Sequence, residues 1–262
     1  MTTLLEIFCR QKIKYQEKIG QLKAFLDKNI EIPIDKGLFK LALSIEDPVD
    51  IRKDMVYLIL HYCIKHDSAI SEKKEKLSFQ DVMKILDEAV SILSNPQYFD
   101  RLINFRDQSR NTLLHQAVIS NNTKAIEALL TYGASPLIKN KEEKIPLDLA
   151  QGDIKKLLIE CMKDQAQSKK ESARCNSLIG IIPGVFLGIG LGVGGALVPS
   201  MTIILCALAV SALVAGIAVG LSIYFLSQDY KQAKLIEGVV AIDSQLNSVK
   251  PEKTADNKAV LG

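Results

Sequence analysis

The chain has 262 residues, a formal net charge of +3, no tryptophan and an aromatic content of 6%. Lysines and glutamates are interspersed, so there is no basic field for a nucleic acid, and the few aromatic residues argue against base stacking. The five cysteines are scattered singly without a CxxC pair, which is typical of free thiols in a reducing compartment and speaks against a zinc site. We therefore expect no nucleic-acid partner, no metal and no cofactor.

Residues 1–100 are predicted to form a helical region. Apolar residues recur at helical spacing up to about Lys28, and again over Leu38–Ile45, Ile51–Ile64 and Phe79–Leu93. No strand-like alternation of useful length occurs before Arg174. The predicted fold class of this part is therefore all-α.

Residues 101–160 contain two related motifs. Thr112–Ala117 (TLLHQA) and Ile145–Ala150 (IPLDLA) align at an offset of 33 residues, and the first resembles the ankyrin signature T-P-L-H-x-A. The resemblance continues through Ala125–Ala134, which corresponds to the second helix of a repeat and its closing Gly-Ala. Two motifs in register at the ankyrin period predict ankyrin repeats here.

The resemblance implies a short ankyrin-like helical repeat solenoid with an N-terminal helical cap. Departures from the pattern include Arg110 and Glu143, which stand where a turn glycine is usual. Because two repeats cannot bury their own faces, degenerate repeats or capping helices are expected upstream. One such repeat would pair Gly37–Ala42 with Met55–Tyr62, and a separate helical domain over residues 1–100 is the alternative.

The resemblance also implies the role of individual residues. His115 matches a family histidine that hydrogen-bonds within the repeat stack, and no P-loop, nucleophile elbow or metal spacing accompanies it, so we expect no enzyme. A protein partner is expected at the turn tips and inner helices, with ordinary solvated side chains as the alternative. The candidate partner-binding residues are Arg106, Gln108, Ser109, Arg110, Gln116, Ser120, Lys139, Lys141, Glu142 and Glu143.

Beyond a polar linker at 161–176, residues 177–227 are predicted to form a transmembrane helical hairpin. Cys175–Gln228 contains no Asp, Glu, Lys or Arg. Pro199-Ser200 divides it into the arms Leu178–Val198 and Met201–Leu226, each near or above the ~20 residues that a helix needs to cross a bilayer. The alternative is a hydrophobic hairpin buried in a globular core or an oligomer.

Positive charges flank both outer ends of the hairpin and are absent from its loop. By the positive-inside rule, this predicts that both chain termini are cytosolic. The tail at 228–262 is expected to be mostly disordered, with room for a short amphipathic helix. Small residues recur every fourth position along both arms, either to pack the arms together or to drive self-association. These residues are Gly184, Gly188, Gly192, Ala212, Gly216 and Gly220.

This combination resembles membrane-anchored ankyrin proteins of intracellular (endosymbiotic or rickettsial-type) bacteria, which implies a bacterial effector candidate. The expected function is a protein-interaction module, tethered to a lipid bilayer and presenting its repeats to the cytosol. The membrane is either a bacterial inner membrane or a host membrane. The alternative is a membrane-active protein whose glycine-rich hairpin oligomerises to perturb or permeabilise a bilayer.

Overall fold

The computed structural model describes residues 15–28, 32–44, 49–66, 69–70, 76–91, 96–197 and 202–248. Side chains between positions 179 and 206 lie outside this description, as do the Pro199-Ser200 loop and residues 249–262. The chain divides into two compact units, Met1–Cys161 and Met162–Gly262.

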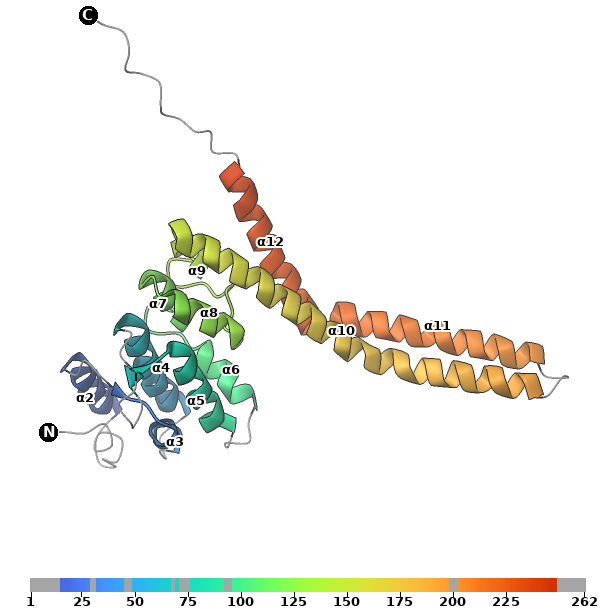
Figure 1. Cartoon of the computed structure of the whole chain (residues 1–262), viewed down its shortest axis with the longest axis horizontal. Helices are drawn as coiled ribbons and strands as arrows, with labels where there is room; N and C mark the ends of the chain where they lie inside the picture. Colours follow the sequence, from blue (N-terminus) through green and yellow to red (C-terminus); the bar gives the residue numbers. More distant parts are fainter. Residues whose placement is uncertain are drawn as a thin grey trace, which may run out of the picture. The chain divides into compact units, whose positions relative to one another are not determined.

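One row of helices runs through the first unit (Figure 1). α4 (Val49–His66) packs against α2 (Tyr15–Lys28) and against α7 (Leu113–Ile119), and α7 packs in turn against α9 (Pro146–Leu149). We call α2, α4, α7 and α9 the inner row. Each of them packs against the next one in the row, which is how a repeat protein builds a continuous core.

A second row lies beside the first. α5 (Phe79–Ser91) packs between α3 (Lys36–Ser44) and α8 (Thr123–Thr131), and α8 also packs against α7. The upstream helices therefore extend the stack that α7 and α8 form. Their pairing differs from the expected degenerate repeat of Gly37–Ala42 with Met55–Tyr62, because α4 and α5, rather than α3 and α4, stack on α7 and α8.

The amphipathic pattern of α5 shows why these helices bury one face. Ser78 and Asp81 form a capping box, in which the Ser78 amide donates to Asp81 Oδ2 at 3.0 Å and the Asp81 amide donates to Ser78 Oγ at 3.2 Å. Apolar residues then recur three or four positions apart and are buried: Phe79, Val82, Met83, Leu86, Ala89 and Val90.

A small sheet in the first unit departs from the all-α expectation, and one helix there was not predicted. A small three-stranded sheet joins β1 (Ile32–Pro33) in parallel to β2 (Ala69–Ile70), which pairs antiparallel with β3 (Lys76–Leu77). Strands of two residues are too short to produce a period-two pattern. A further helix, α6 (Pro96–Ile103), begins at a proline whose missing N–H costs nothing at the first helical position.

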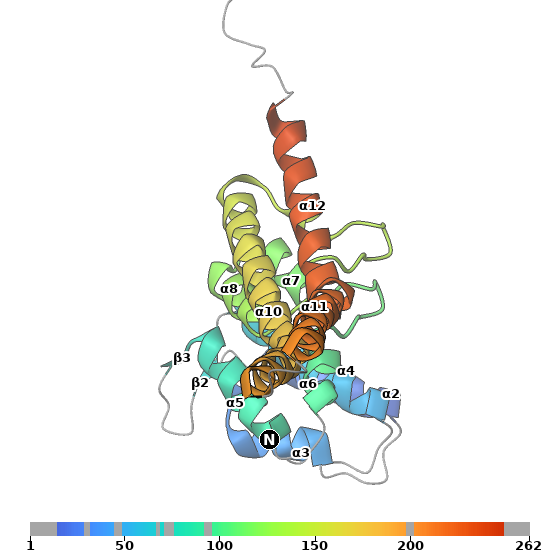
Figure 2. The same ribbon diagram turned by 90° about the vertical axis from the view of Figure 1, so that its right-hand side faces the viewer.

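The second unit consists of helices. α10 (Gly152–Leu197) begins in the first unit, so the expected linker at 161–176 is helical and continuous with it. α11 (Thr202–Leu226) runs antiparallel beside the last part of α10 (Figures 1 and 2). α12 (Gln228–Ser248) corrects the expectation of a mostly disordered tail, because it places 21 residues in a helix where Ala233, Ile236 and Val240 are buried.

Among the residues whose side chains the structure describes, one helix is long and apolar enough to cross a membrane. It is Ala207–Leu226 of α11, with a mean hydropathy of 2.2, and only 17% of its apolar window is buried. The first predicted arm falls on residues of α10 whose side chains lie outside the description. The transmembrane hairpin therefore remains a prediction.

Candidate protein-interaction surface

Two turns with the same hydrogen bonds project from the inner row, 33 residues apart. We call them the first tip, residues 107–111, and the second tip, residues 140–144. In the first, Asp107 Oδ1 accepts from the amides of Ser109 at 2.8 Å and Asn111 at 2.9 Å. In the second, Asn140 Oδ1 accepts from the amides of Glu142 at 2.9 Å and Lys144 at 3.1 Å. A short carboxylate or amide side chain thus organises each turn through local backbone bonds.

Each tip contains a residue in the left-handed region where glycine is usual in the family. Arg110 and Glu143 both have φ of +59°. Such a conformation costs a residue with a Cβ roughly 1–2 kcal/mol. The backbone shape of the repeat is therefore kept despite the departures in sequence, and the side chains at these positions point away from the buried core as exposed groups.

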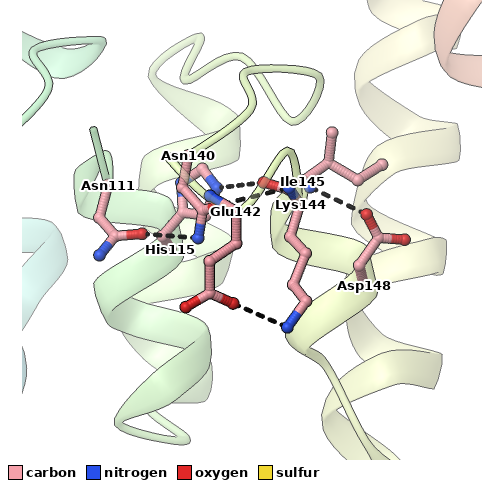
Figure 3. A network of polar contacts seen from close by, with 7 residues as sticks. All are labelled: Asn111, His115, Asn140, Glu142, Lys144, Ile145 and Asp148. Atoms are coloured by element: carbon pink, nitrogen blue, oxygen red, sulfur yellow. Dashed lines mark hydrogen bonds and ion pairs between the residues drawn. The ribbon is translucent and has the colours of Figure 1, made fainter. Parts of the chain in front are cut away.

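His115 connects the two repeats (Figure 3). Its Nδ1 accepts from the Thr112 amide at 3.1 Å, so the proton lies on Nε2, which donates to the Lys144 carbonyl oxygen at 3.1 Å. Burial lowers the pKa of His115, and the bond to Lys144 opposes that shift only in part. The neutral, buried imidazole therefore caps α7 and binds the second tip, which agrees with the stacking role that the resemblance implies.

The tips also contact each other directly. The Lys141 amide donates to the Ser109 carbonyl oxygen at 3.0 Å, and Asn140 Nδ2 donates to Asn111 Oδ1 at 3.1 Å. These bonds are between backbone or short side chains, so they fix the spacing of the tips. The longer charged side chains on the tips are left to face solvent.

Asp107 ties the first tip to the inner helices as well. Its Oδ2 accepts from Tyr57 Oη of α4 at 3.1 Å and from Gln116 Nε2 of α7 at 3.2 Å. Burial and the neighbouring Asp107 carboxylate raise the pKa of Tyr57, so its hydroxyl stays protonated and remains a donor. This tyrosine was not singled out from the sequence, because its partner lies 50 positions away.

A groove of about 680 Å³ opens between α2 and α4 and reaches the first tip. The face of α4 that lines it includes Tyr57, His61 and Lys65, and the face of α2 includes Gly20 and Lys23. Two histidines of α4 line the groove: His61 is half-buried and His66 is exposed. The two histidines stand five residues apart, so helical spacing does not place them on one stripe of α4, and only the tertiary packing shows that both border the groove.

Four charges of the second tip and its flank are paired with each other. Lys139 Nζ lies 3.3 Å from Glu143 Oε2, and Lys144 Nζ lies 2.8 Å from Glu142 Oε2. The hydrogen bond to Lys144 lowers the pKa of Glu142, and the same bond raises the pKa of Lys144. All four side chains are solvent-exposed, so these pairs contribute little to stability.

The predicted partner-binding residues divide by exposure. Gln116 and Ser120 are half-buried, and both have structural roles: Gln116 donates to Asp107, and the Ser120 amide ends α7 by donating to the Gln116 carbonyl. The other eight are exposed: Arg106, Gln108, Ser109, Arg110, Lys139, Lys141, Glu142 and Glu143. In the part of the chain that the structure describes, no cluster of histidine, cysteine or acidic residues could hold a metal ion.

Comparison with known proteins agrees with this geometry. The family model described as ankyrin repeat matches residues 109–138. Over 73 residues the chain is 41% identical to oxysterol-binding protein-related protein 1 of Mus musculus and 40% identical to those of Rattus norvegicus and Homo sapiens. The aligned stretch covers 28% of this chain but 8% of each relative's length.

No solved structure matches the chain. The family match and the paired tips together show that the chain contains an ankyrin-repeat region, a type of module that generally mediates binding to protein partners.

Proposed function

We propose that this protein is a membrane-anchored protein-interaction module whose ankyrin region binds a protein partner and whose α10–α11 hairpin holds it in a bilayer. The observation that carries the anchoring is the surface of α11. This helix exposes a series of large apolar side chains that water would disfavour: Leu208, Val210, Val214, Ile217, Val219, Leu221, Phe225 and Leu226.

An aromatic cluster at the end of α11 supports this proposal. The ring centroids of Tyr224 and Phe225 are 5.1 Å apart, and Tyr230 lies 4.6 Å from Tyr224 and 5.2 Å from Phe225. Charged residues resume at Asp229, within this cluster. Tyrosine is enriched where a membrane span meets water, so the cluster fits a bilayer interface at this level.

Ion pairs between α10 and α12 indicate that the hairpin leaves the bilayer here and enters water. Lys170 of α10 pairs with Glu237 of α12, and Lys169 Nζ lies 4.0 Å from Asp229 Oδ1. Since all four charges precede α10's apolar part or follow α11, both chain ends of the hairpin leave on the same side. With cations at both outer ends, the positive-inside rule favours cytosolic termini.

The finer features of the proposal follow the resemblance stated above. A cytosolic ankyrin module on a two-helix anchor resembles the membrane-anchored ankyrin proteins of intracellular bacteria, and on this analogy the protein would act as an effector. A bacterial inner membrane and a host membrane both fit the hairpin.

The test is fractionation of the full chain after expression, beside a variant lacking residues 175–228, with protease protection of tags at both ends. We expect carbonate-resistant membrane association that requires the deleted segment, with both tags cleaved from the cytosolic side. A soluble, monodisperse full chain would overturn the anchoring. Leakage of liposomes caused by the full chain would instead favour the membrane-active alternative.

A further inference from the structure

We propose that the two tips and the groove beside them form one docking surface for an acidic peptide segment with an apolar anchor residue. This inference rests on the proposed interaction function and specifies the chemistry of the partner. It follows from which charges at the tips are already neutralised inside the chain and which are not.

Some of the cations at and beside the tips are paired with acids of the chain, and others are not. Lys139, Lys144 and the two glutamates beside them neutralise one another. Arg106, Arg110 and Lys141 are exposed, and their side chains form no ion pair or hydrogen bond with any described residue. The carboxylate of the first tip, Asp107, accepts four hydrogen bonds from the turn and from the helices α4 and α7.

A backbone hydrogen bond brings two of these cations, Arg110 and Lys141, to neighbouring positions. Because the Lys141 amide bonds to the Ser109 carbonyl, Lys141 of the second tip lies against the residue that precedes Arg110. The left-handed φ of Arg110 further fixes the direction in which its side chain leaves the turn. Cations at neighbouring positions on two hydrogen-bonded turns favour a ligand with carboxylates in series.

The groove continues this surface beyond the tips. Its lining includes Gln108 and Ser109 of the first tip, and also Lys23 and Lys65, which have no ion pair among the described residues. Asp27 is an exposed acid in the lining, and Asp54 is half-buried, with a pKa raised by burial. The groove is thus mixed in charge, with the tip end as its cationic part.

The dimensions and lining of the groove fit a peptide. From Asp54 to His66 the lining face of α4 extends roughly 18 Å at 1.5 Å per residue, a length that about six extended residues cover. Ile19 and Leu58 are half-buried in the lining and provide apolar surface for one anchor side chain. Because Asp27, Asp54 and Asp107 also line the groove, we expect the acidic part of the peptide at the tips and its apolar anchor in the groove.

The experiment uses the full chain reconstituted in nanodiscs of phosphatidylcholine. The probe is a fluorescein-labelled peptide of about ten residues, long enough to cover the groove and both tips, with two central leucines among glutamates. Matched peptides replace glutamate with glutamine or with lysine. Fluorescence anisotropy measures the dissociation constant at low and high salt.

The variants separate charge from groove occupancy. Arg106→Glu, Arg110→Glu and Lys141→Glu together reverse the tip charge, and the matched control reverses three other exposed cations of the first unit, Lys84, Arg101 and Lys124. Gly20→Phe fills the groove, since a Cβ at Gly20 meets open space, and Gly238→Phe on α12 is its control for the same reason.

We expect the glutamate peptide to bind, with affinity falling at high salt, and the tip reversal to weaken it by about tenfold or more. Gly20→Phe should also weaken binding, whereas both controls leave it unchanged. The inference is overturned if the glutamine peptide binds equally well, if the tip reversal has no effect, or if anionic vesicles or poly(U) RNA displace the peptide and bind more tightly themselves.

The outcome is distinguishable from failure of the proposed function. Membrane association is measured without the peptide, and circular dichroism of each variant reports folding. If the ankyrin region captures a cellular protein and the tip reversal leaves that capture intact, the interaction function stands and the acidic-partner inference fails.

Discussion

The Nε2 atom of His115 donates to the backbone carbonyl of Lys144 across 29 residues of sequence, and this bond connects the cap of α7 to the turn before α9. Replacing His115 with alanine leaves the Thr112 amide and the Lys144 carbonyl without their partners. A buried group that loses its hydrogen bond costs about 1–3 kcal/mol. We expect His115→Ala to speed amide hydrogen exchange across residues 104–150. The free energy of exchange, measured by mass spectrometry, should fall by this amount.

The matched control is His66→Ala, since His66 is exposed and stacks on the ring of Tyr62, outside residues 104–150. It should leave exchange in residues 104–150 unchanged. Equal exchange in wild type and His115→Ala would show that this bond contributes nothing to the stack.

Acidification should loosen the same cap. Burial lowers the pKa of His115, so the folded state favours the neutral imidazole and the unfolded state binds the proton more readily. The contribution to stability is complete above the unfolded pKa of about 6.5 and is lost as pH falls from there through the folded pKa. On protonation Nδ1 gains a hydrogen and no longer accepts from the Thr112 amide.

The readout is the protection factor of the Thr112 amide on either side of that pH, corrected for intrinsic exchange. The amide of Ala125, which donates to the non-titrating Asn122 side chain at 3.0 Å, is the internal control. Because burial also lowers the pKa of His61, a global loss of stability with acid has the same sign, and the difference between the two amides isolates His115. Protection at Thr112 that does not fall relative to Ala125 would contradict the assignment.

Asp107 offers a substitution that separates turn formation from helix tethering. The second tip uses Asn140 at the equivalent position, so Asp107→Asn should retain the bonds from Ser109 and Asn111. The amide nitrogen cannot accept from Tyr57 and Gln116, so these two bonds are lost. We expect a cost of about 1–2 kcal/mol for Asp107→Asn and more for Asp107→Ala, which loses both sets.

Urea unfolding of the nanodisc-bound chain, followed by circular dichroism, measures the difference in the free energy of unfolding between the variants. The Tyr57→Phe variant should reproduce part of the Asp107→Asn loss. If Asp107→Asn and Asp107→Ala are equally unstable, the local turn bonds are not what Asp107 contributes.

Glycine should be favourable at the two left-handed positions. Glu143→Gly removes the steric cost of φ +59°, at the expense of greater freedom in the unfolded chain. Since the lost pair with Lys139 is exposed and weak, we expect Glu143→Gly to be neutral or to stabilise by up to about 1 kcal/mol. Lys141→Gly is the control, because Lys141 is outside the left-handed region and should be destabilised in the same unfolding measurement.

The sequence predicts the repeat through its period. Offset motifs place Arg110 and Glu143 at equivalent turn positions, and both prove to have the same φ. Helical spacing likewise predicts α4 and α5, whose buried faces the structure confirms. The signal is local in each case, because turn geometry and amphipathicity depend on neighbours a few residues apart.

What the sequence did not predict depends on contacts between distant segments. Neither the bond from Tyr57 to Asp107 nor the groove between α2 and α4 leaves a periodic trace. The helical tail was missed for a different reason. α12 is polar on most of its surface, and its buried residues Ala233, Ile236 and Val240 are too few to give a strong amphipathic pattern.

The small-residue row of α11 distinguishes packing within the hairpin from self-association. Gly216 and Gly220 are buried, whereas the neighbouring Ala215 is exposed. Small residues at this spacing let helices approach closely in lipid. Under the hairpin proposal α10 covers this row, so Gly216→Leu should separate the two arms, while Ala215→Leu, which faces outward, should be tolerated.

Two measurements on the full chain in detergent test this prediction. Gly216→Leu should lower the thermal stability of the helices, measured by circular dichroism, and leave the oligomeric state measured by sedimentation unchanged. If Gly216→Leu instead converts an oligomer to a monomer without loss of thermal stability, the row joins separate copies. The membrane-active alternative would then gain support, because bilayer perturbation by a hairpin requires several copies to assemble.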